Sequence, residues 1–443
     1  MILQRKLRKL NNCYFSKFTR ILERGNRMVV FHMLHPFPIY ASKKHWNEFL
    51  SNSTADKFLY NKLRGLKILI KSVDVDILEL SKARKKFFKQ LSSFNSLYLV
   101  LTKECNYKCT YCPFSDLSDK TQMDKKILKK GVDLWVKNIK SSVAPINDLL
   151  VVFYGGEPLL NKECIYFGIL YLYKLIKVKK LPSGLKIILA TNGSLLDRDL
   201  MVFLKKYHVM VTIGLDGINK ELNWQRIKKD SSTSFFDSMR IIRELIKYKV
   251  DVSISTTITP TNFSAINKLG LVFKRMGIKR FGFNLLRGEA AGNSARNRDL
   301  YYSRAADLMI KNFQNQKDAD FEFQMSKKSS SFSNENFAID CSCCGNHFVI
   351  MPNGDISHCP FSNKKLGSLN DKIDDFDINN LNYVKKLKKR YPLFDISKHL
   401  YYWTSLYGGG CLWNVKRFED IDTGYQIFAK KVFDFLIWQN KKI

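Results

Sequence analysis

The stretch "SLYLVLTKECNYKCTYCPF", residues 96–114, decides how the whole chain is interpreted. It begins with a mostly apolar run of the length of a buried strand and continues into a loop with three cysteines. Cys105, Cys109 and Cys112 have no His and no fourth Cys close by. A structural zinc site needs four ligands, so this loop fits zinc poorly. Three thiolates suit three corners of a cubane [4Fe–4S] cluster and leave its fourth iron open to a substrate or cofactor.

Further strand-like runs follow this first one at intervals. They are "DLLVVFYGG" (148–156), "LKIILATNG" (185–193), "VMVTIGLDG" (209–217), "VDVSISTTIT" (250–259) and "KRFGFNLLRG" (279–288). Amphipathic, helix-like stretches such as 123–139 and 234–248 lie between them. Strands that alternate with helices predict repeated βα units and a parallel sheet. Six units predict an α/β fold, a partial (β/α)6 barrel of the TIM type, in place of the closed eightfold barrel.

Polar motifs stand at the ends of these strands, where barrels of this kind carry their reactive groups. They are "YGGEP" (154–158), "TNGS" (191–194) and "GLDG" (214–217). Gly155 and Gly156 let the backbone approach a ligand closely, and the Glu157 carboxylate could hold an ammonium group. Asn192 could hydrogen-bond a ribose or a carboxylate, although an Asn–Gly pair is also a common turn.

The cysteine loop resembles the signature of the radical S-adenosylmethionine (radical SAM) superfamily, CxxxCxxC with an aromatic residue before the last cysteine. Cys105, Cys109, Tyr111 and Cys112 match it. The resemblance implies that the open iron chelates the amino and carboxylate groups of SAM. It also implies that one electron from the cluster cleaves SAM to a 5′-deoxyadenosyl radical, which abstracts a hydrogen atom.

The resemblance also assigns SAM contacts. These are Tyr111, Gly155, Gly156, Glu157, Asn192, Asp216 and Arg226. Glu157 and the two glycines correspond to the segment that binds the amino group of SAM. Arg226 corresponds to an arginine near the SAM carboxylate, although a surface arginine is the plain alternative. The family's usual Ser at one strand end is Gly214 here, so a hydroxyl contact is missing there.

A second cysteine group, "CSCCGNHFVIMPNGDISHCPF", occupies residues 341–361. Within it "MPNGDI" (351–356) predicts a tight hairpin turn that brings Cys344 and Cys359 together. This arrangement resembles the opening of the SPASM domain, an extension of radical SAM enzymes that modify peptides and proteins.

A full SPASM domain carries two auxiliary [4Fe–4S] clusters, but Lys398, Tyr401 and Tyr407 stand where three ligands of one cluster belong. The resemblance therefore implies a single, Twitch-like auxiliary cluster. Its candidate ligands are four of Cys341, Cys343, Cys344, Cys359 and Cys411. Four thiolates also suit tetrahedral zinc, so zinc remains an alternative at this second site.

The chain divides into three predicted domains. Residues 1–90 form a basic N-terminal α+β extension with helices over 44–66 and a short hairpin over 65–80. Residues 91–325 form the partial barrel, and 335–443 form the C-terminal iron–sulfur domain with a mainly irregular tail. The Ser- and Asn-rich stretch 324–337 is predicted to be a linker.

Composition indicates which binding partners and which cellular compartment to expect. The 443 residues include 74 Lys and Arg against 40 Asp and Glu, a net charge of +34, which attracts polyanions. The basic residues are spread along the whole chain, which is also typical of a solvated cationic surface. No apolar run is long enough for a membrane span and the charged N-terminus lacks a signal-peptide pattern, so we expect a cytoplasmic protein. Cys13 and Cys164 are expected to be small buried side chains.

These observations together predict a radical SAM enzyme that matures a ribosomally made precursor peptide, by crosslinking, thioether formation, epimerisation or oxidation. The expected partners are this peptide, with an acidic leader that residues 1–90 could capture by strand addition, and an electron donor such as flavodoxin or ferredoxin. A structural cap on the barrel is the alternative role of residues 1–90. A sulfatase-type protein maturase and a radical SAM enzyme that modifies RNA are the alternatives. Nucleic acid is the weaker choice, because no recognisable RNA-binding module accompanies the charge.

Overall fold

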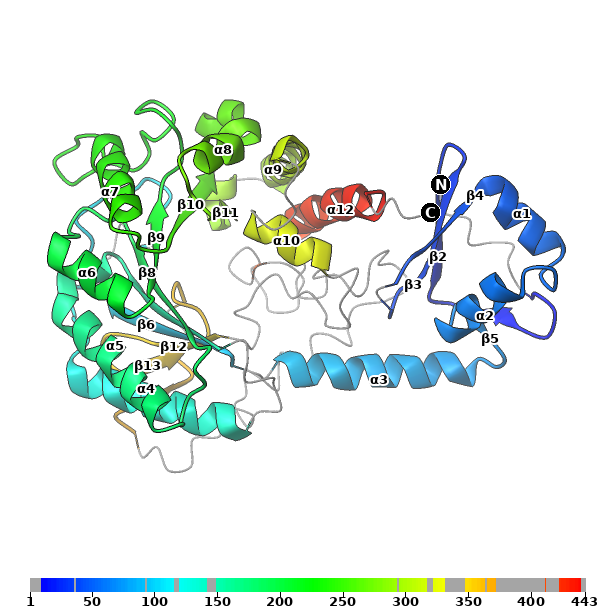
Figure 1. Ribbon diagram of the computed structural model, residues 1–443, viewed down its shortest axis with the longest axis horizontal. Coiled ribbons are helices and arrows are strands. Elements are labelled where there is room, and N and C mark those ends of the chain that lie inside the picture. Colours follow the sequence, from blue (N-terminus) through cyan, green and yellow to red (C-terminus); the bar gives the residue numbers. More distant parts are fainter. Residues whose placement is uncertain are drawn as a thin grey trace.

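The structure is a computed structural model of the chain. It describes residues 9–35, 37–91, 94–114, 119–141, 149–292, 295–316, 322–330, 347–362, 365–371, 411 and 422–439. The predicted partial barrel dominates it (Figure 1).

Six parallel strands form the barrel, as the sequence predicts. They are β6 (Ser96–Thr102), β7 (Leu150–Gly155), β8 (Lys186–Thr191), β9 (Met210–Gly214), β10 (Val252–Ile258) and β11 (Arg280–Leu285). They lie side by side in chain order, each hydrogen-bonded in parallel to the next. The carboxyl ends of all six strands therefore meet at one edge of the sheet, where the polar motifs stand.

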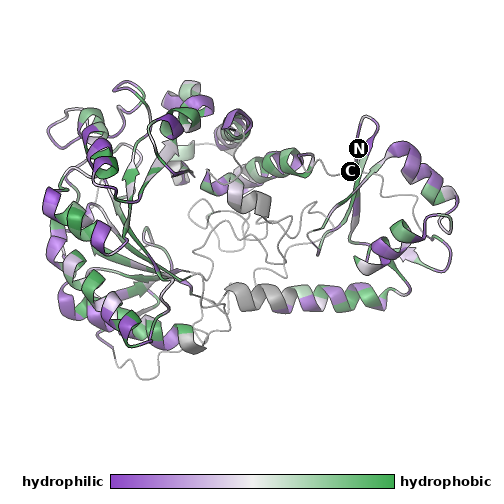
Figure 2. Ribbon diagram, viewed as in Figure 1, coloured by the Kyte–Doolittle hydropathy of each residue, from purple (hydrophilic) through white to green (hydrophobic). Residues whose placement is uncertain are grey.

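Helices cover the outer face of this sheet. They are α4 (Lys125–Ser141), α5 (Lys162–Lys177), α6 (Arg198–Lys206), α7 (Phe235–Lys247) and α8 (Phe263–Arg275). Each turns an apolar stripe inward; in α7 this stripe includes Ile241, Ile242 and Leu245, all 0% exposed. Figure 2 shows the apolar colour on the strands and on the inner side of these helices.

The sheet extends beyond β6 through the second cysteine group. The "MPNGDI" turn joins β12 (His347–Ile350) to β13 (Asp355–Ser357), and Gly354 adopts φ +86° in it, so the predicted hairpin is confirmed. The sequence did not predict that β12 pairs in parallel with β6, and that β13 is followed by β14 (Gly367–Ser368). The hairpin before Cys359 is therefore built into the barrel sheet.

A buried carboxylate seals the other edge of the sheet. Glu322 is 1% exposed and accepts hydrogen bonds from the backbone N–H of Phe283 in β11 and of Gln324 and Met325, which begin α10 (Phe323–Ser330). It caps a helix and satisfies an edge-strand donor at once. The predicted linker over 324–337 is wrong for its first part, because the helix starting at Phe323 is anchored by this carboxylate.

Replacing Glu322 with Gln is expected to destabilise the protein by about 1–3 kcal/mol, because an NH₂ group would face backbone donors that need an acceptor. Urea or thermal unfolding of Glu322→Gln beside Glu48→Gln, whose side chain is 64% exposed, measures this difference. Equal midpoints for the two variants would show that the carboxylate does not hold this edge.

The N-terminal extension is an α+β unit, but its strands were misplaced. Its sheet consists of β2 (Thr19–Arg24), β3 (Arg27–His32) and β4 (Ile39–Ser42), and α1 (Lys43–Ser51) and α2 (Lys57–Gly65) confirm the predicted helices. The predicted hairpin over 65–80 is wrong. Leu69–Ile70 (β5) pairs with Tyr14–Phe15 (β1), and α3 (Asp74–Leu91) follows. The Asp76 carboxylate fixes the start of α3 by accepting hydrogen bonds from the Ser16 hydroxyl and the Lys17 backbone N–H.

The tail is not wholly irregular, because residues Thr423–Ile437 form the helix α12. It packs on α9 (Ala295–Gln316), where Lys431 bonds Asp307 at 2.8 Å. At its far end the Tyr40 hydroxyl donates to the Ile437 carbonyl at 2.6 Å. The helix thus connects the barrel to the N-terminal sheet, and in Figure 1 it spans the space between them.

Candidate active site

The cysteine loop begins directly after β6 and is held from the side by a second segment. The backbone N–H groups of Lys108 and Thr110 donate to the carbonyls of Ile227 and Gln225, at 2.8 and 3.1 Å. In return the Lys229 N–H donates to the Asn106 carbonyl at 3.2 Å. Residues 225–229 therefore lie antiparallel to residues 106–110. No strand pattern in the sequence predicts this pairing, because it arises between two loops.

The three cysteines of the loop form no disulfide, and their thiols are largely shielded. Cys109 is buried, and Cys105 and Cys112 are half-buried. Burial raises the pKa of the Cys105 thiol to about 12, with smaller contributions from Glu157 and the other two thiols. A metal centre that binds here must therefore displace a proton that the free thiol holds firmly at neutral pH.

The number of these thiols bears on which metal they fit. In the described part of the chain, no three His, Cys, Asp or Glu side chains converge as the ligands of a single ion would. Ligands of one zinc ion lie about 2.3 Å from it and so crowd together. In a cubane each thiolate binds a different iron, so the thiols stand farther apart. The three thiolates predicted from the sequence match three of the four irons of a cubane.

Gly155 and Gly156 bring the end of β7 into contact with the cysteine loop. A Cβ on Gly155 would lie 2.2 Å from the Thr102 carbonyl oxygen, and one on Gly156 would lie 2.3 Å from the Glu104 carbonyl oxygen. The Gly156 N–H donates to the Thr102 carbonyl at 2.9 Å, and Gly155 has φ +142°. The sequence predicts that these glycines let a ligand approach closely. In the structure they allow the backbone that precedes Cys105 to pack against the end of β7.

The carboxylate of Glu157 faces into the protein and is 0% exposed. Its Oε1 accepts from the Thr191 hydroxyl at 2.6 Å and the Leu159 N–H at 3.0 Å, and its Oε2 accepts from the Asn192 N–H at 2.8 Å. Burial raises the pKa of this carboxyl, and these donors oppose the rise. Glu157 therefore joins the ends of β7 and β8, with three donors already on its oxygens.

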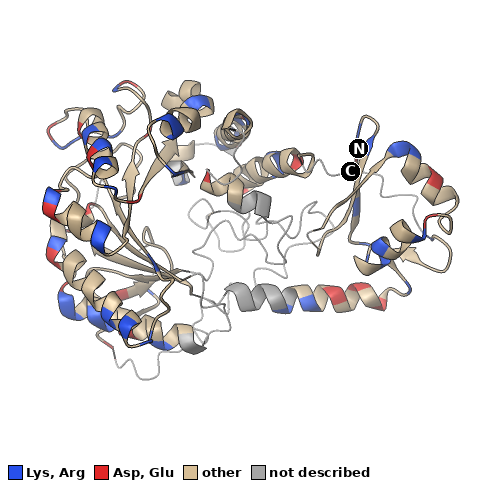
Figure 3. Ribbon diagram, in the orientation of Figure 1, with Lys and Arg blue, Asp and Glu red and all other residues tan. Residues whose placement is uncertain are grey.

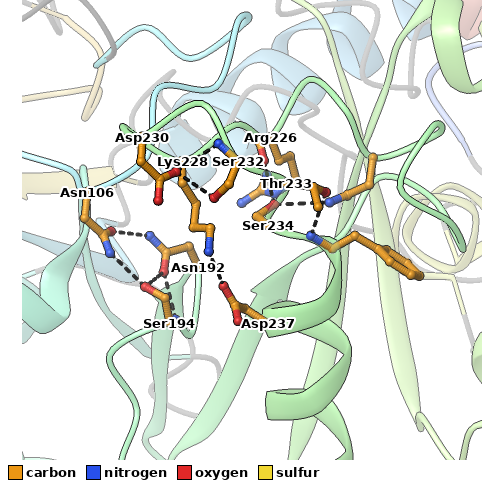
Figure 4. Close-up of polar contacts among 12 residues, drawn as sticks. Asn106, Asn192, Ser194, Arg226, Lys228, Asp230, Ser232, Thr233, Ser234 and Asp237 are labelled. Atoms are coloured by element: carbon orange, nitrogen blue, oxygen red, sulfur yellow. Dashed lines mark hydrogen bonds and ion pairs between the residues drawn. The ribbon is translucent and has the colours of Figure 1, made fainter.

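Asn192 contacts the cysteine loop directly. Its Nδ2 donates to the Asn106 Oδ1 at 2.8 Å and reaches the Cys105 sulfur at 3.9 Å. Its Oδ1 accepts from the Ser194 hydroxyl at 2.7 Å, and Ser194 in turn accepts from Asn106 at 2.8 Å. Figure 4 shows these three side chains closed into a ring. Sequence reasoning missed Asn106 and Ser194, which carry no motif of their own.

Tyr111, Asp216 and Arg226 come together from three separate segments. The Tyr111 hydroxyl donates to the Asp216 Oδ2, and the Arg226 Nη1 donates to the Tyr111 oxygen at 2.9 Å. The Asp216 Oδ1 accepts from the Thr257 N–H at 2.9 Å, and burial raises the pKa of this carboxyl. The Arg226 Nε–H is buried without a protein acceptor, so one donor of the guanidinium remains for a ligand.

Gly214 is the reason why Arg226 can reach this position. A Cβ on Gly214 would lie 2.2 Å from the Arg226 Nη2 and 2.4 Å from its Cζ. The guanidinium therefore occupies the place where a serine side chain would begin. At this strand end the family pattern has a serine hydroxyl. In this chain the guanidinium of Arg226 occupies that position instead.

The second cysteine segment touches the first through aromatic side chains. Phe361, two residues after Cys359, lies 5.4 Å from the Phe114 ring and 6.0 Å from the Tyr154 ring. The Arg287 guanidinium lies 5.6 Å from the centre of Phe361. Burial raises the pKa of Tyr154. The hairpin thus places Cys359 near the reactive end of the barrel.

Cys411 lies on a small cavity of about 80 Å³ at the β11 edge. Its lining comprises Phe283, Asn284, Leu285, Arg287, Tyr302, Met309, Gln324, Cys411, Tyr425 and Phe428. The other candidate auxiliary ligands, Cys341, Cys343 and Cys344, lie outside the described residues, as do Lys398, Tyr401 and Tyr407. The auxiliary site therefore stays a prediction.

Cys13 and Cys164 are both 2% exposed. The Cys164 thiol donates to the Met123 carbonyl at 3.0 Å, and the Cys13 sulfur lies 3.3 Å from the Tyr60 hydroxyl. Both are small buried side chains, as expected.

A large part of the barrel is similar to known proteins. Residues 99–267 match the family model described as the radical SAM superfamily. A cysteine-type anaerobic sulfatase-maturating enzyme of Clostridium novyi is 25% identical over 194 residues, which are 44% of this chain and 51% of that protein. The matched region covers between 48% and 62% of the first curated relatives, less than two thirds of their length.

Two solved structures share the fold. The structure of anSMEcpe with bound AdoMet and the Cp18Cys peptide has a TM-score of 0.59 at 21% identity, over 78% of this chain and 98% of that one. SuiB of Streptococcus suis bound to S-adenosylmethionine has a TM-score of 0.52 at 17% identity, over 92% and 98%. Residues 99–267 thus form a radical SAM domain in a chain that shares the fold of anSMEcpe and SuiB, and this superfamily implies S-adenosylmethionine and [4Fe–4S] cofactors. In the described residues no helix is long and apolar enough to cross a membrane.

Proposed function

We propose that this radical SAM enzyme matures a ribosomally made precursor peptide. The observation that carries the proposal is the place of the second cysteine segment. Its hairpin continues the barrel sheet beside β6, and Phe361 packs on Phe114 and Tyr154. An enzyme built in this way has Cys359 beside the reactive end of the barrel, where the modified residue of a peptide would lie.

In this proposal the chain's own residues hold the cofactors. Cys105, Cys109 and Cys112 bind the cluster that takes up SAM, and these cofactors, when bound, supply the hydrogen-abstracting radical. Arg226 offers its unpartnered Nε–H to the SAM carboxylate. Asn192 and Glu157 act as positioning residues, because the first holds the loop at Asn106 and the second fixes Asn192.

Peptide capture is assigned to the N-terminal extension, although not to the hairpin that we expected. Within the described residues β2 and β4 are the outer strands of the three-stranded sheet. A leader segment could add as a fourth strand to either edge, which provides main-chain hydrogen bonds to any sequence. The link from β4 through Tyr40 to α12 would connect such a site to the barrel.

Maturation of a sulfatase-type protein substrate is the second candidate, favoured by the similarity to sulfatase-maturating enzymes. The residues Lys398, Tyr401 and Tyr407 count against it, since they replace three ligands of a second auxiliary cluster. An enzyme that modifies RNA would be expected to carry a basic patch at the mouth of the barrel, because the RNA backbone is anionic. The described loops at the reactive end instead carry eight Lys and Arg and eight Asp and Glu, which counts against an RNA substrate.

A metal count tests the cofactor assignment. Protein reconstituted without oxygen is expected to hold about eight irons per chain, and a Cys105/Cys109/Cys112→Ala variant about four. About four irons with one zinc in the unaltered protein would remove the auxiliary [4Fe–4S] cluster from the proposal. Zinc without iron would contradict the radical chemistry altogether. Incubation with candidate precursor peptides, followed by mass spectrometry, then tests the substrate class.

A further inference from the structure

The fold gathers basic residues that are scattered along the sequence. Four turns lead from a barrel helix into the next strand, over residues 174–186, 205–210, 247–252 and 274–280. Together they carry thirteen Lys and Arg and a single acidic residue, Asp251. The basic residues are Lys174, Lys177, Lys179, Lys180, Lys186, Lys205, Lys206, Lys247, Lys249, Lys274, Arg275, Lys279 and Arg280. We call these residues the basic face.

Parallel topology places all four turns at one end of the barrel. The strands β8, β9, β10 and β11 are neighbours and run in the same direction, so their starts lie side by side. Every member of the basic face is exposed. Figure 3 shows Lys and Arg recurring on the helices that end in these turns.

The opposite, reactive end of the barrel has no such excess. Its described loops, 103–114, 119–124, 156–161, 192–197, 215–234, 259–262 and 286–287, carry eight basic and eight acidic residues. The first four residues of α4, α5, α6, α7 and α8, which follow these loops, add four basic and three acidic residues. The positive charge of the barrel is thus concentrated at the end away from the cysteine loop. A generally Lys-rich composition would raise the positive charge at both ends, so it does not account for this asymmetry.

Helix electrostatics explain only part of the basic face. Cations in the last turn of a helix interact favourably with its dipole. Seven of the thirteen members stand in such turns: Lys174, Lys177, Lys205, Lys206, Lys247, Lys274 and Arg275. Members such as Lys180 and Lys279 lie beyond the helix ends, where this benefit fades. Of the members beyond the helix ends, Arg280 pairs with Asp251 at 3.4 Å, which is the single acidic residue of the four turns.

We propose that the basic face binds an anionic phospholipid surface, with the reactive end turned away from the bilayer. Eleven of its thirteen cations are Lys, which act as point charges, whereas nucleic-acid recognition favours the planar fork of Arg. Between these lysines Val178 is 52% exposed, and the Lys206 ammonium lies 5.5 Å from the Tyr207 ring centre. Exposed lysines mixed with an apolar and an amphipathic aromatic side chain suit a headgroup layer.

Vesicle co-sedimentation of the full chain tests this inference. The probes are phosphatidylcholine vesicles with and without about 30% phosphatidylglycerol, at low and high salt. The test variant is Lys179→Glu/Lys180→Glu/Lys206→Glu/Lys279→Glu. The matched control reverses four exposed lysines elsewhere, Lys44, Lys57, Lys126 and Lys430, with the same change in net charge.

We expect binding to the anionic vesicles only, lost at high salt and weakened at least about 100-fold in the test variant but little in the control. Equal binding to both vesicle types, or an equal loss in both variants, would overturn the proposal. So would tRNA binding that the test variant loses while neither vesicle type binds, since the face would then serve nucleic acid. Thermal unfolding of both variants confirms that they fold. The outcome is independent of the peptide substrate.

Discussion

Gly156→Ala is expected to remove SAM cleavage almost completely while the rest of the barrel stays folded. The added Cβ would lie 2.3 Å from the Glu104 carbonyl oxygen and 2.4 Å from that of Lys103. Backbone oxygens cannot rotate away as a side chain can, so the strand β6 end and the loop after it must move apart from β7. Cys105 is the next residue and moves with them.

The expected size follows from how sensitive reacting groups are to position. A misplacement of about 1 Å can cost about 100-fold in rate. Iron content and 5′-deoxyadenosine formation are measured on reconstituted Gly156→Ala beside Gly184→Ala. Gly184 has no atom within 4 Å of an added Cβ and stands at the opposite end of the barrel. Normal iron and normal cleavage in Gly156→Ala would show that the β7 end can relax without disturbing the loop.

The sequence predicted the barrel because each of its strands and helices has a local signature. The run at 96–102 matches β6 residue for residue, and the strand ends carry the Gly, Asn and Asp motifs. Those signatures depend on periodicity and turn residues, which a single segment contains. The cysteine loop is recognisable for the same reason, since its spacing lies within eight residues.

The errors arose where structure depends on partners far away in sequence. Residues 69–70 form a strand only because Tyr14 and Phe15 pair with them, and 74–91 become a helix whose start Asp76 fixes through Ser16. The parallel pairing of β12 with β6 joins segments about 250 residues apart. No local pattern encodes such contacts, as tertiary packing overrides weak propensities.

Among the candidate site residues, side-chain types were predicted better than roles. Glu157 and Asp216 were expected to face SAM, yet both are buried and their oxygens accept protein donors. A motif predicts that a carboxylate is needed at a strand end, but not toward which neighbour it turns. Asn106 and Ser194 were missed because a ring of small polar side chains has no spacing signature.

Gly214→Ala is expected to weaken SAM binding as much as removing the Arg226 side chain does. The new Cβ would overlap the guanidinium at 2.2 Å, and the flexible arginine side chain can move away at little cost to the fold. The guanidinium then loses the hydrogen bond to the Tyr111 oxygen, and its Nε–H no longer points toward the position proposed for the SAM carboxylate. A charged hydrogen bond contributes about 1.5–3 kcal/mol, so the SAM dissociation constant should rise about 10- to 100-fold.

A double-mutant cycle separates this mechanism from general damage. If Gly214 acts only by leaving room for Arg226, then Gly214→Ala/Arg226→Ala binds SAM no more weakly than Arg226→Ala alone. Gly282→Ala on β11 is the matched control, because its added Cβ would meet its nearest neighbour, the Phe323 Cβ, at an ordinary 3.5 Å. Additive losses in the double variant would mean that Gly214 contributes independently of Arg226. Equal SAM affinity in Gly214→Ala and the unaltered protein would mean that the guanidinium does not hold SAM from this position.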